Sequence, residues 1–445
     1  MQLADALRVT PRRTVAFVGA GGKSSAMARL AAELAPHGPV VITTTSKLAL
    51  SQAALAESHL IIQDPSSLSS LPAMLEEHHS VLITRGVARG EPKWLGLDLS
   101  SLESLRRTSA QMGAPLLIEA DGARGRSLKA PAPHEPIVPS FVDLVVPVAG
   151  LDVVGMPLDE QWVHRVDRVS QILGLRPGAA IEVEHVAALL SAPDGGLQGI
   201  PPGAEVRVLL NKANTPDRLE AGRSIARFLL TNPRIQAGIV GSVNEEPPVR
   251  EMFGRVAGIV LAAGASRRLQ QPKQLVRWRG KPLVWHAAWA AMEAGLSPVI
   301  VVGGAESSAI RAALKELPIL FVQNVDWDLG QSTSVRAGLD AAGTGIDAAI
   351  FLLSDTPFVT DHVLRAILTE YRRTGTPIVA PRVMDRWANP VLFDRSTFPA
   401  LQELQGDQGG RAIFERFRIA GIHWDDSITL DVDTPEDLAQ LRSLE

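Results

Sequence analysis

A segment of small residues and cations carries the clearest chemical signal in the sequence. It runs from Val260 to Leu275 and reads Val-Leu-Ala-Ala-Gly-Ala-Ser-Arg-Arg-Leu-Gln-Gln-Pro-Lys-Gln-Leu. Its small residues allow the backbone to approach a nucleoside triphosphate closely. Arg268 and Lys273 are suited to neutralise the triphosphate and a departing pyrophosphate, which is the main electrostatic need of nucleotidyl transfer. The alternative is an Ala/Gly-rich turn followed by a solvated basic loop.

Aspartates after apolar runs form the second part of this expected site. Asp355 follows the run 348–353, where a carboxylate can hold Mg²⁺ against the α-phosphate. Asp431 or Asp433 would complete the metal site from a neighbouring strand end. An attacking phosphate oxygen is already anionic, so the reaction needs no protein general base. Asp355 as a turn-stabilising residue, and Asp433 as the N-cap of a helix over 435–441, are the alternatives.

A second glycine loop follows an apolar run near the N-terminus and reads Gly19-Ala-Gly21-Gly22-Lys23-Ser24. Backbone N–H groups of such a loop can converge on a phosphate at the start of a helix. Lys23 would add a charge near the phosphates and Ser24 would bind Mg²⁺, with ATP or GTP as the expected nucleotide. The spacing is shorter than in a full P-loop and is similar to that of Mur ligases and folylpolyglutamate synthetases. A tight strand-to-helix turn with an exposed lysine is the alternative.

Two further segments support an anion site in this half. Asp121 lies just past the strand expected over 115–118, in the position of a Walker B acid, and Arg124 lies in the cationic loop that follows. Asn211 and Lys212 resemble the base-reading Asn-Lys-x-Asp of GTP-binding proteins, although the final residue is Asn214 here. Strand-end turns and a solvated loop are the alternatives.

The motifs of the first half resemble the YqeC family over residues 1–245. The similar segments are Gly-Ala-Gly-Gly-Lys-Ser-Ser from Gly19, Thr-Thr-Thr-Ser-Lys from Thr43, Glu-Ala-Asp-Gly-Ala-Arg-Gly-Arg-Ser-Leu-Lys-Ala-Pro from Glu119, His-Glu-Pro from His134, and Asn-Lys from Asn211. Members of that family are accessory proteins of selenium-dependent molybdenum hydroxylases. The resemblance implies such a hydroxylase, or its maturation chaperone, as a partner.

The second half resembles the MobA-like nucleotidyltransferases over residues 255–445. The resemblance implies nucleotide contacts by the following residues: Leu261, Ala262, Ala263, Gly264, Ser266, Gly304, Ser332 and Ser334. The Pro272-Lys273 form is similar to that of molybdenum cofactor cytidylyltransferases. It implies an Mg²⁺-dependent enzyme that joins CTP to molybdenum-molybdopterin and releases pyrophosphate. Leu269-Gln270 replaces the usual Met-Gly pair.

Three alternatives stay open for the second half. The acceptor could be a sugar phosphate or another small phosphate, because the glycine loop and Asp355 would look the same. The nucleotide could be GTP or ATP, since no residue reads the base directly. The whole chain could be a non-catalytic carrier that inserts the cofactor into a hydroxylase, for which the Leu269-Gln270 departure is the support.

The elements that must position these residues are alternating strands and helices. Short apolar runs bounded by turn signals recur in both halves, which is typical of strands buried on both faces of a parallel sheet. We predict two three-layer αβα domains, the first P-loop-like and the second a Rossmann-like, GT-A-like nucleotidyltransferase sheet. The expected domains are 1–245 and 256–445, with 246–255 as a linker that contains paired prolines.

Composition excludes several classes of protein. With 44 basic and 48 acidic side chains in 445 residues, the chain has neither the basic excess of a nucleic-acid binder nor that of a cationic membrane-surface protein. The absence of cysteine excludes disulfides, cysteine-ligated zinc and iron–sulfur clusters. No apolar run reaches membrane-spanning length and no signal peptide is evident, so we expect a cytoplasmic protein with small-molecule substrates.

Overall fold

The computed structural model describes residues 1–266, 268–269 and 271–444, and the chain divides into two compact units, Met1–Phe253 and Gly254–Glu445. The departure from the family pattern at Gln270 lies outside the described residues. The segment 246–255, expected to be a linker, forms strand β13 (Val249–Gly254) instead. Its apolar side chains, Val249 and Phe253 among them, are buried in the first unit, which is why the segment is ordered against a sheet.

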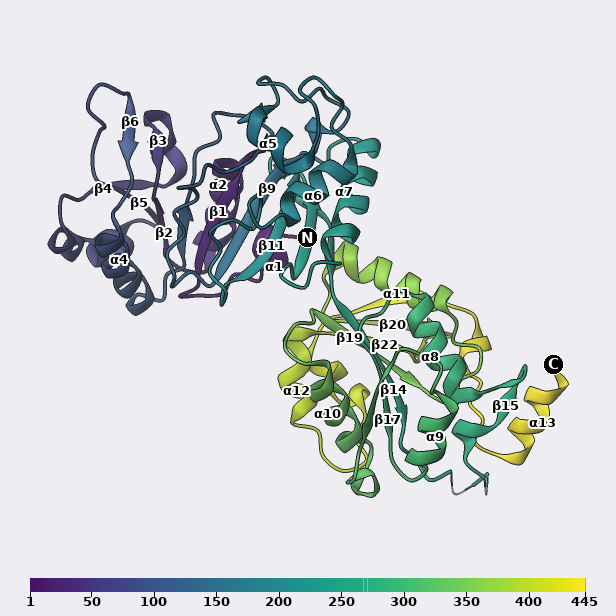
Figure 1. Cartoon of the computed structure of the whole chain (residues 1–445). Coiled ribbons are helices and arrows are strands. Elements are labelled where there is room, and N and C mark those ends of the chain that lie inside the picture. The colour runs from purple at the N-terminus through teal and green to yellow at the C-terminus, as the bar shows by residue number, and fades with distance from the viewer. Residues whose placement is uncertain (267, 270, 445) are drawn as a thin grey trace. The chain divides into compact units, whose positions relative to one another are not determined.

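The first unit is built on a largely parallel sheet (Figure 1). Across the sheet the order is β13, β12 (Ala237–Gly241), β11 (Glu205–Asn211), β9 (Leu144–Gly150), β1 (Thr14–Gly19), β7 (Leu116–Glu119), β2 (Val40–Thr44), β5 (Ser80–Thr84) and β4 (Ser58–Ile61). Every neighbouring pair of strands from β12 to β4 is parallel. The carboxyl ends of these strands therefore meet at one edge, which gathers the predicted N-terminal site residues.

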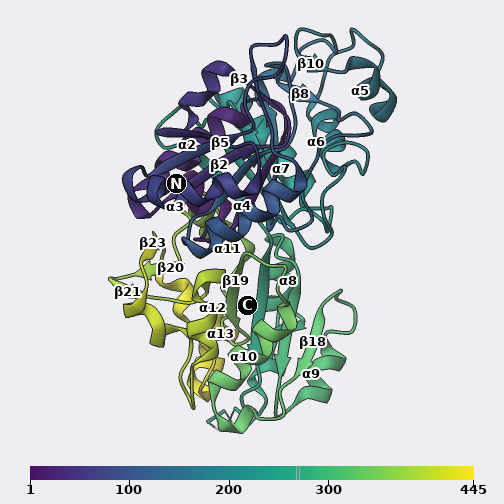
Figure 2. The ribbon, with the colours of Figure 1, turned by 90° about the vertical axis from the view of Figure 1, so that its left-hand side faces the viewer.

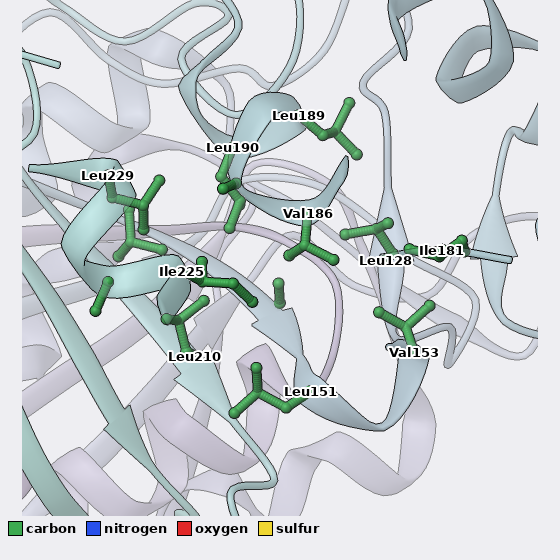
Figure 3. Packing of buried hydrophobic residues seen from close by; sticks show 14 of the residues in the cluster. Leu128, Leu151, Val153, Ile181, Val186, Leu189, Leu190, Leu210, Ile225 and Leu229 are labelled. Carbon is green, nitrogen blue, oxygen red and sulfur yellow. The ribbon is translucent and has the colours of Figure 1, made fainter. Parts of the chain in front are cut away.

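Every residue of β2, β5, β7 and β9 is buried, as expected of strands in a sheet that has helices on both faces. The helices are α1 (Leu3–Leu7), α2 (Lys23–Leu34), α3 (Leu71–Glu77), α4 (Leu99–Gln111), α5 (Val166–Leu173), α6 (Val183–Ser191) and α7 (Pro216–Leu229). Short strand pairs flank them, namely β3 (Lys47–Ala49) with β6 (Lys93–Leu95) and β8 (Leu128–Lys129) with β10 (Val163–His164). In Figure 3, Leu189 and Leu190 of α6 and Ile225 and Leu229 of α7 lie in one cluster with Leu210 of β11.

The sheet of the second unit is mixed. Its order is β18 (Leu320–Gln323), β17 (Val299–Gly303), β14 (Val256–Ala262), β19 (Ala348–Leu353), β22 (Val391–Asp394), β20 (Ile378–Val383) and β21 (Arg386–Trp387), with β23 (Ile419–His423) beside β20. The strands from β18 to β19 are parallel, whereas β22 runs antiparallel to both of its neighbours. The sheet is thus parallel through β19 and mixed beyond it, at the edge that carries β22 and β20.

Helices lie on both sides of this second sheet (Figures 1 and 2). They are α8 (Leu283–Glu293), α9 (Ser307–Ala313), α10 (Gln331–Ala342), α11 (Asp361–Thr374), α12 (Phe398–Gln402) and α13 (Pro435–Ser443), and β15 (Arg277–Trp278) pairs with β16 (Lys281–Pro282) beside them. Two glycines permit close packing on β14. A side chain at Gly258 would meet Ala291 of α8, and one at Gly338 of α10 would meet Ile259.

Both units are three-layer α/β structures, which confirms the predicted fold class. The parallel strands β14, β17 and β19 direct their carboxyl ends to one edge, where the second glycine loop and Asp355 follow. Within the described part of the chain, no helix has both the length and the apolar character to cross a membrane.

Candidate active site

A cavity of about 730 Å³ opens at the carboxyl ends of β14 and β19. One wall is the second glycine loop and its basic residues. A second wall is the segment 327–334, which runs from the loop after β18 into the first turn of α10. A third wall carries carboxylates from three separate loops, Asp355, Asp407 and Asp433. The cavity thus combines basic side chains, acidic side chains and a backbone of small residues. This combination suits a ligand that carries phosphate groups together with a metal cation.

The buried side chain of Gln274 orients the glycine loop. Its Nε2 donates to the carbonyl oxygen of Gly264 at 2.7 Å and to that of Ala262 at 3.3 Å, while the N–H of Ala305 donates to the carbonyl of Ala263. In a trans peptide the N–H points opposite to the C=O. The N–H groups of Gly264 and Ala265 therefore point away from these internal partners. Both residues line the cavity, where such N–H groups can contact phosphate.

Lys273 joins two of the aspartates. Its Nζ contacts Asp355 and lies 2.6 Å from Oδ1 of Asp433. Arg268 lies 3.5 Å from the other oxygen of Asp433 and is 78% exposed. The predicted catalytic residues Arg268, Lys273 and Asp355 are thus brought together with Asp433 in one place.

The local fold fixes the positions of both acids. The N–H of Val432 donates to the carbonyl of Asp355 at 3.1 Å, and the N–H groups of Asp433 and Thr434 donate to Asp437. Thr434 is the N-cap of α13, so the cap belongs to Thr434 and not to Asp433. Leu269 packs with Val432 and residues of α13, which ties the glycine loop to the same corner.

Electrostatics follow this geometry. Burial acts to lower the pKa of Lys273, but the charges of Asp355 and Asp433 outweigh it and the pKa is raised. The pKa of Asp431 is also raised, first by burial and then by Asp433 and Asp355. Lys273 is therefore a firmly charged ammonium between two carboxylates.

A metal ion would be held by Asp355 and Asp433. Among the described residues no three His, Asp or Glu side chains gather closely enough to bind a metal by themselves. Mg²⁺ is commonly held by one or two carboxylates together with substrate phosphates and water. The paired oxygens of Asp355 and Asp433 fit that requirement. Asp431 does not line the cavity.

The predicted nucleotide-binding residues separate into two groups. Leu261, Ala263, Gly264, Ser266 and Ser334 line the cavity. Those that do not are Ala262, Gly304 and Ser332. A Cβ at Gly304 would lie 2.5 Å from the carbonyl of Ala263 and 2.7 Å from the indole of Trp327, so this glycine lets Trp327 pack beside the loop. Ser332 is completely buried in the first turn of α10.

Sequence reasoning missed Gln274 and the wall formed by Trp327, Leu329 and Gln331. Gln274 lies inside the recognised Pro-Lys-x-Leu segment, so its position between two motif residues was an available signal. Trp327 and Gln331 likewise belong to the same segment as Ser332 and Ser334, but only the packing of β17 and α10 on β14 places them against the glycine loop.

The N-terminal glycine loop has the opposite arrangement. The N–H of Gly19 donates to Asp121, that of Ala20 to the carbonyl of Val148, and that of Gly21 to the carbonyl of Arg126. Gly19, Gly21 and Gly22 have positive φ, and a Cβ at Gly21 would lie 2.1 Å from the backbone N of Gly150. The glycines are thus required for close packing against β9, and the first N–H groups of the loop are already engaged within the protein.

Behind this loop lies a buried network of charges. Lys23 donates to the carbonyl of Gly19 at 2.7 Å and lies 3.2 Å from Asp121. Lys129 lies 2.7 Å from the other oxygen of Asp121 and 2.8 Å from Glu135. Glu135 is also paired with Arg165. Asp121 therefore serves as the shared partner of two lysines.

Ser24 contacts the acid at the end of β7. Its Oγ donates to Oε2 of Glu119 at 2.8 Å and accepts from Nε2 of Gln52 at 2.5 Å. Burial raises the pKa of Glu119. The carboxylate next to Ser24 is thus Glu119, and the Walker-B-like position of Asp121 is used for the lysine network.

Asn211, the last residue of β11, supports the same loop, and Lys212 follows it. Asn211 donates to the carbonyl of Gly21 at 2.8 Å and accepts from the N–H of Val243 at 3.1 Å. Lys212 lies 2.8 Å from Asp152. These contacts account for the polar groups of Asn211 through backbone partners, as expected of a packing residue.

Arg124 lies at the exposed end of the cationic loop with a positive φ of 49°. Its charge reaches His164, whose pKa is lowered to about 4, first by burial and then by Arg165, Lys129 and Arg124. Burial is the main cause, and the three cations Arg165, Lys129 and Arg124 near His164 add to it.

Comparison with known proteins divides the chain in the same way. The model of the MobA-like NTP transferase domain matches residues 258–421, and that of the YqeC protein matches residues 15–167. The uncharacterized protein YqeC of Escherichia coli (strain K12) is 30% identical over 251 residues, which cover 54% of this chain and 91% of that protein. The chain belongs to the YqeC family. Both resemblances in the sequence are confirmed.

The second unit has its own relatives. Nicotine blue oxidoreductase of Paenarthrobacter nicotinovorans is 31% identical over 197 residues, 42% of this chain and 96% of that protein. The crystal structure of Rv0371c from Mycobacterium tuberculosis H37Rv is 30% identical and covers 42% of this chain and 98% of that chain, with a TM-score of 0.38. In this YqeC-family chain the second unit is a MobA-like NTP transferase domain, and the protein is a nucleotidyltransferase.

Proposed function

We propose that the second unit is a molybdenum cofactor cytidylyltransferase. It takes CTP and molybdenum-molybdopterin and forms the cytosine dinucleotide form of the cofactor with pyrophosphate. The observation that supports this most directly is the cavity in which Lys273 and Arg268 meet Asp355 and Asp433 beside a glycine loop. The choice of CTP rests on the resemblance at Pro272-Lys273.

The reaction needs little covalent participation by the protein. A phosphate oxygen of the acceptor bonds to the α-phosphorus of CTP, and the bond between that phosphorus and the β-bridging oxygen breaks. The electron pair of that bond leaves with pyrophosphate, and no proton needs to be transferred. A bound Mg²⁺ would withdraw charge from the phosphates. Lys273 and Arg268 neutralise the charge of the pyrophosphate, and the N–H groups of Gly264 and Ala265 orient the triphosphate.

The test is pyrophosphate release by the full chain with Mg²⁺ and molybdenum-loaded molybdopterin, with CTP, GTP and ATP offered separately. Release with CTP alone supports the proposal. Release only with another nucleotide, or only with a sugar phosphate as acceptor, assigns a different substrate to the same site. Tight cofactor binding without release in any mixture would favour the carrier function and overturn the proposal.

The first unit enters this proposal as an accessory domain for a molybdenum hydroxylase or its maturation chaperone. A nucleotide such as ATP or GTP at its glycine loop would have to compete with Asp121 for Lys23, because Lys23 and Asp121 form a buried ion pair. The exposed Arg124, close to Lys129 and Arg165, supports an anionic ligand at the mouth of the loop. Titration calorimetry of the full chain with ATP and GTP, comparing wild type with Arg124→Ala, tests this role. Equal affinity in both proteins would remove Arg124 from the site.

A further inference from the structure

Lys273 fills the position between the carboxylates that the proposed reaction needs for a divalent cation. Its Nζ contacts Asp355 and lies 2.6 Å from Asp433. The side chains of Asp355 and Lys273 are only 9% and 20% exposed, so water screens this group weakly. Without a cation the two carboxylates would repel each other, and the ammonium removes that repulsion.

A metal ion would bind the same oxygen atoms. Oδ2 of Asp355 and Oδ1 of Asp433 are the atoms in contact with Nζ. A divalent cation held by these two side chains cannot occupy the position while the ammonium is there. The ammonium and the metal are therefore alternatives at one place.

The long side chain of Lys273 can move while its backbone stays in place. Its N–H donates to Oγ of Ser266 at 3.0 Å, which fixes its backbone. The two acids are fixed through Val432 and Asp437, as described above. The stem of lysine is flexible and carries its charge at the tip, so the ammonium can leave the acids while the loop stays in place.

We propose that Lys273 is the resident cation of the metal site and couples metal binding to nucleotide binding. A divalent cation alone must displace an ammonium that then has no anionic partner. A triphosphate supplies that partner, so metal and nucleotide enter together and each raises the affinity for the other. The inference rests on the proposed nucleotidyl transfer at this site and adds that the free enzyme excludes free metal.

The test measures binding of Mn²⁺, without nucleotide, by electron paramagnetic resonance. Lys273→Met should bind Mn²⁺ at least about tenfold more tightly than the wild type, equivalent to about 1.4 kcal/mol. Arg268→Met is the matched control. It removes the same charge beside Asp433, but from an exposed position 3.5 Å away, and should change the affinity by less than about threefold. An equal rise in Mn²⁺ affinity in both variants would mean that any lost positive charge near the acids has this effect, and would overturn the proposal.

Two further measurements cover the case in which Lys273→Met does not fold. Lys273→Gln keeps hydrogen-bond donors between the acids but removes the charge, and should also bind Mn²⁺ more tightly. In the unaltered protein, saturating Mn²⁺ should increase the acetylation of Lys273, read by mass spectrometry against Lys281, which pairs with Glu316 outside the cavity. Unchanged acetylation at saturation overturns the proposal. Because no nucleotide is present, failure of the CTP reaction would leave these results interpretable.

Discussion

The two glycine loops of this chain look alike in sequence and differ in the direction of their backbone groups. In the first loop, N–H groups from Gly19 to Gly21 donate into the protein. In the second, the carbonyls of Ala262, Ala263 and Gly264 accept from within the protein. Since the two groups of a peptide point in opposite directions, the N–H groups of Gly264 and Ala265 point away from internal acceptors, whereas those of Gly19, Ala20 and Gly21 are already engaged.

The lysines of the two loops differ in the same sense. Lys23 and Asp121 are 4% and 2% exposed and belong to a closed network with Lys129. Lys273 lies at a cavity of about 730 Å³ and has two acids that a substrate or metal can reach. Glycine loops of similar sequence therefore differ here in how far their lysine is enclosed by the protein.

The sharpest test of this contrast is Asp355→Asn. Replacing the carboxylate removes a partner of Lys273 and of the metal, so turnover should fall by about 10³-fold, a loss of the size seen when a preorganised electrostatic group is removed. Pyrophosphate release measures it. Any nucleotide hydrolysis by the first unit should persist, and equal loss of both activities would contradict separate sites.

Asp121→Asn should lower the stability of the first unit. It leaves Lys23 and Lys129 without their shared charge in a buried position, which should cost the first unit about 3 kcal/mol. Hydrogen exchange of peptides from β1 and β7, followed by mass spectrometry, measures this in the full chain. Peptides from β14 serve as the internal control, and unchanged protection in β1 would show that the network is not structural.

The glycines themselves give a paired comparison. Gly21→Ala places a Cβ against the backbone of Gly150 at a φ of 85° and should destabilise the first unit by at least about 2 kcal/mol. Gly264→Ala meets nothing within 4 Å and should leave stability within about 0.5 kcal/mol. It should instead raise KM for the nucleotide. The comparison fails if Gly264→Ala unfolds and Gly21→Ala does not.

Gln274→Met tests what orients the second loop. Methionine keeps the volume but removes the donors to Gly264 and Ala262, so the loop can turn and KM for the nucleotide should rise about tenfold. Steady-state kinetics separates this from a change in kcat. A fall in kcat with unchanged KM would assign Gln274 to the chemical step instead.

A smaller effect is expected from pH. Burial acts to raise the pKa of Glu135, but bonds from Arg165 and Lys129 outweigh it and hold the pKa at about 2, against an ordinary value of 4.5. Because the folded pKa is lowered, this stabilisation is present above pH 4.5 and is lost as pH falls toward 2. The difference in melting temperature between wild type and Glu135→Gln should be smaller at about pH 3 than at about pH 6.

Much of the fold could be predicted from the sequence, because buried strands leave a local signal. The apolar runs at 14–18, 144–148, 257–261 and 348–353 are all strands of the two sheets. Strand β22 and the strand nature of 249–254 were missed. The burial of both segments depends on neighbours that are distant in the chain. For 249–254, the paired prolines before Val249 also indicated a linker more strongly than the apolar residues indicated a strand.

The sequence by itself determined the two α/β units, the glycine loops and the acids Asp355 and Asp433, since residue type and spacing express these directly. Only the tertiary structure decided which backbone groups of each loop are engaged within the protein, carbonyls by Gln274 in one unit and N–H groups by β9 and its neighbours in the other. It also placed Glu119, and not Asp121, beside Ser24 and set Lys273 between two acids. Such choices depend on which strand ends meet at a sheet edge, and no local pattern of residues carries that information.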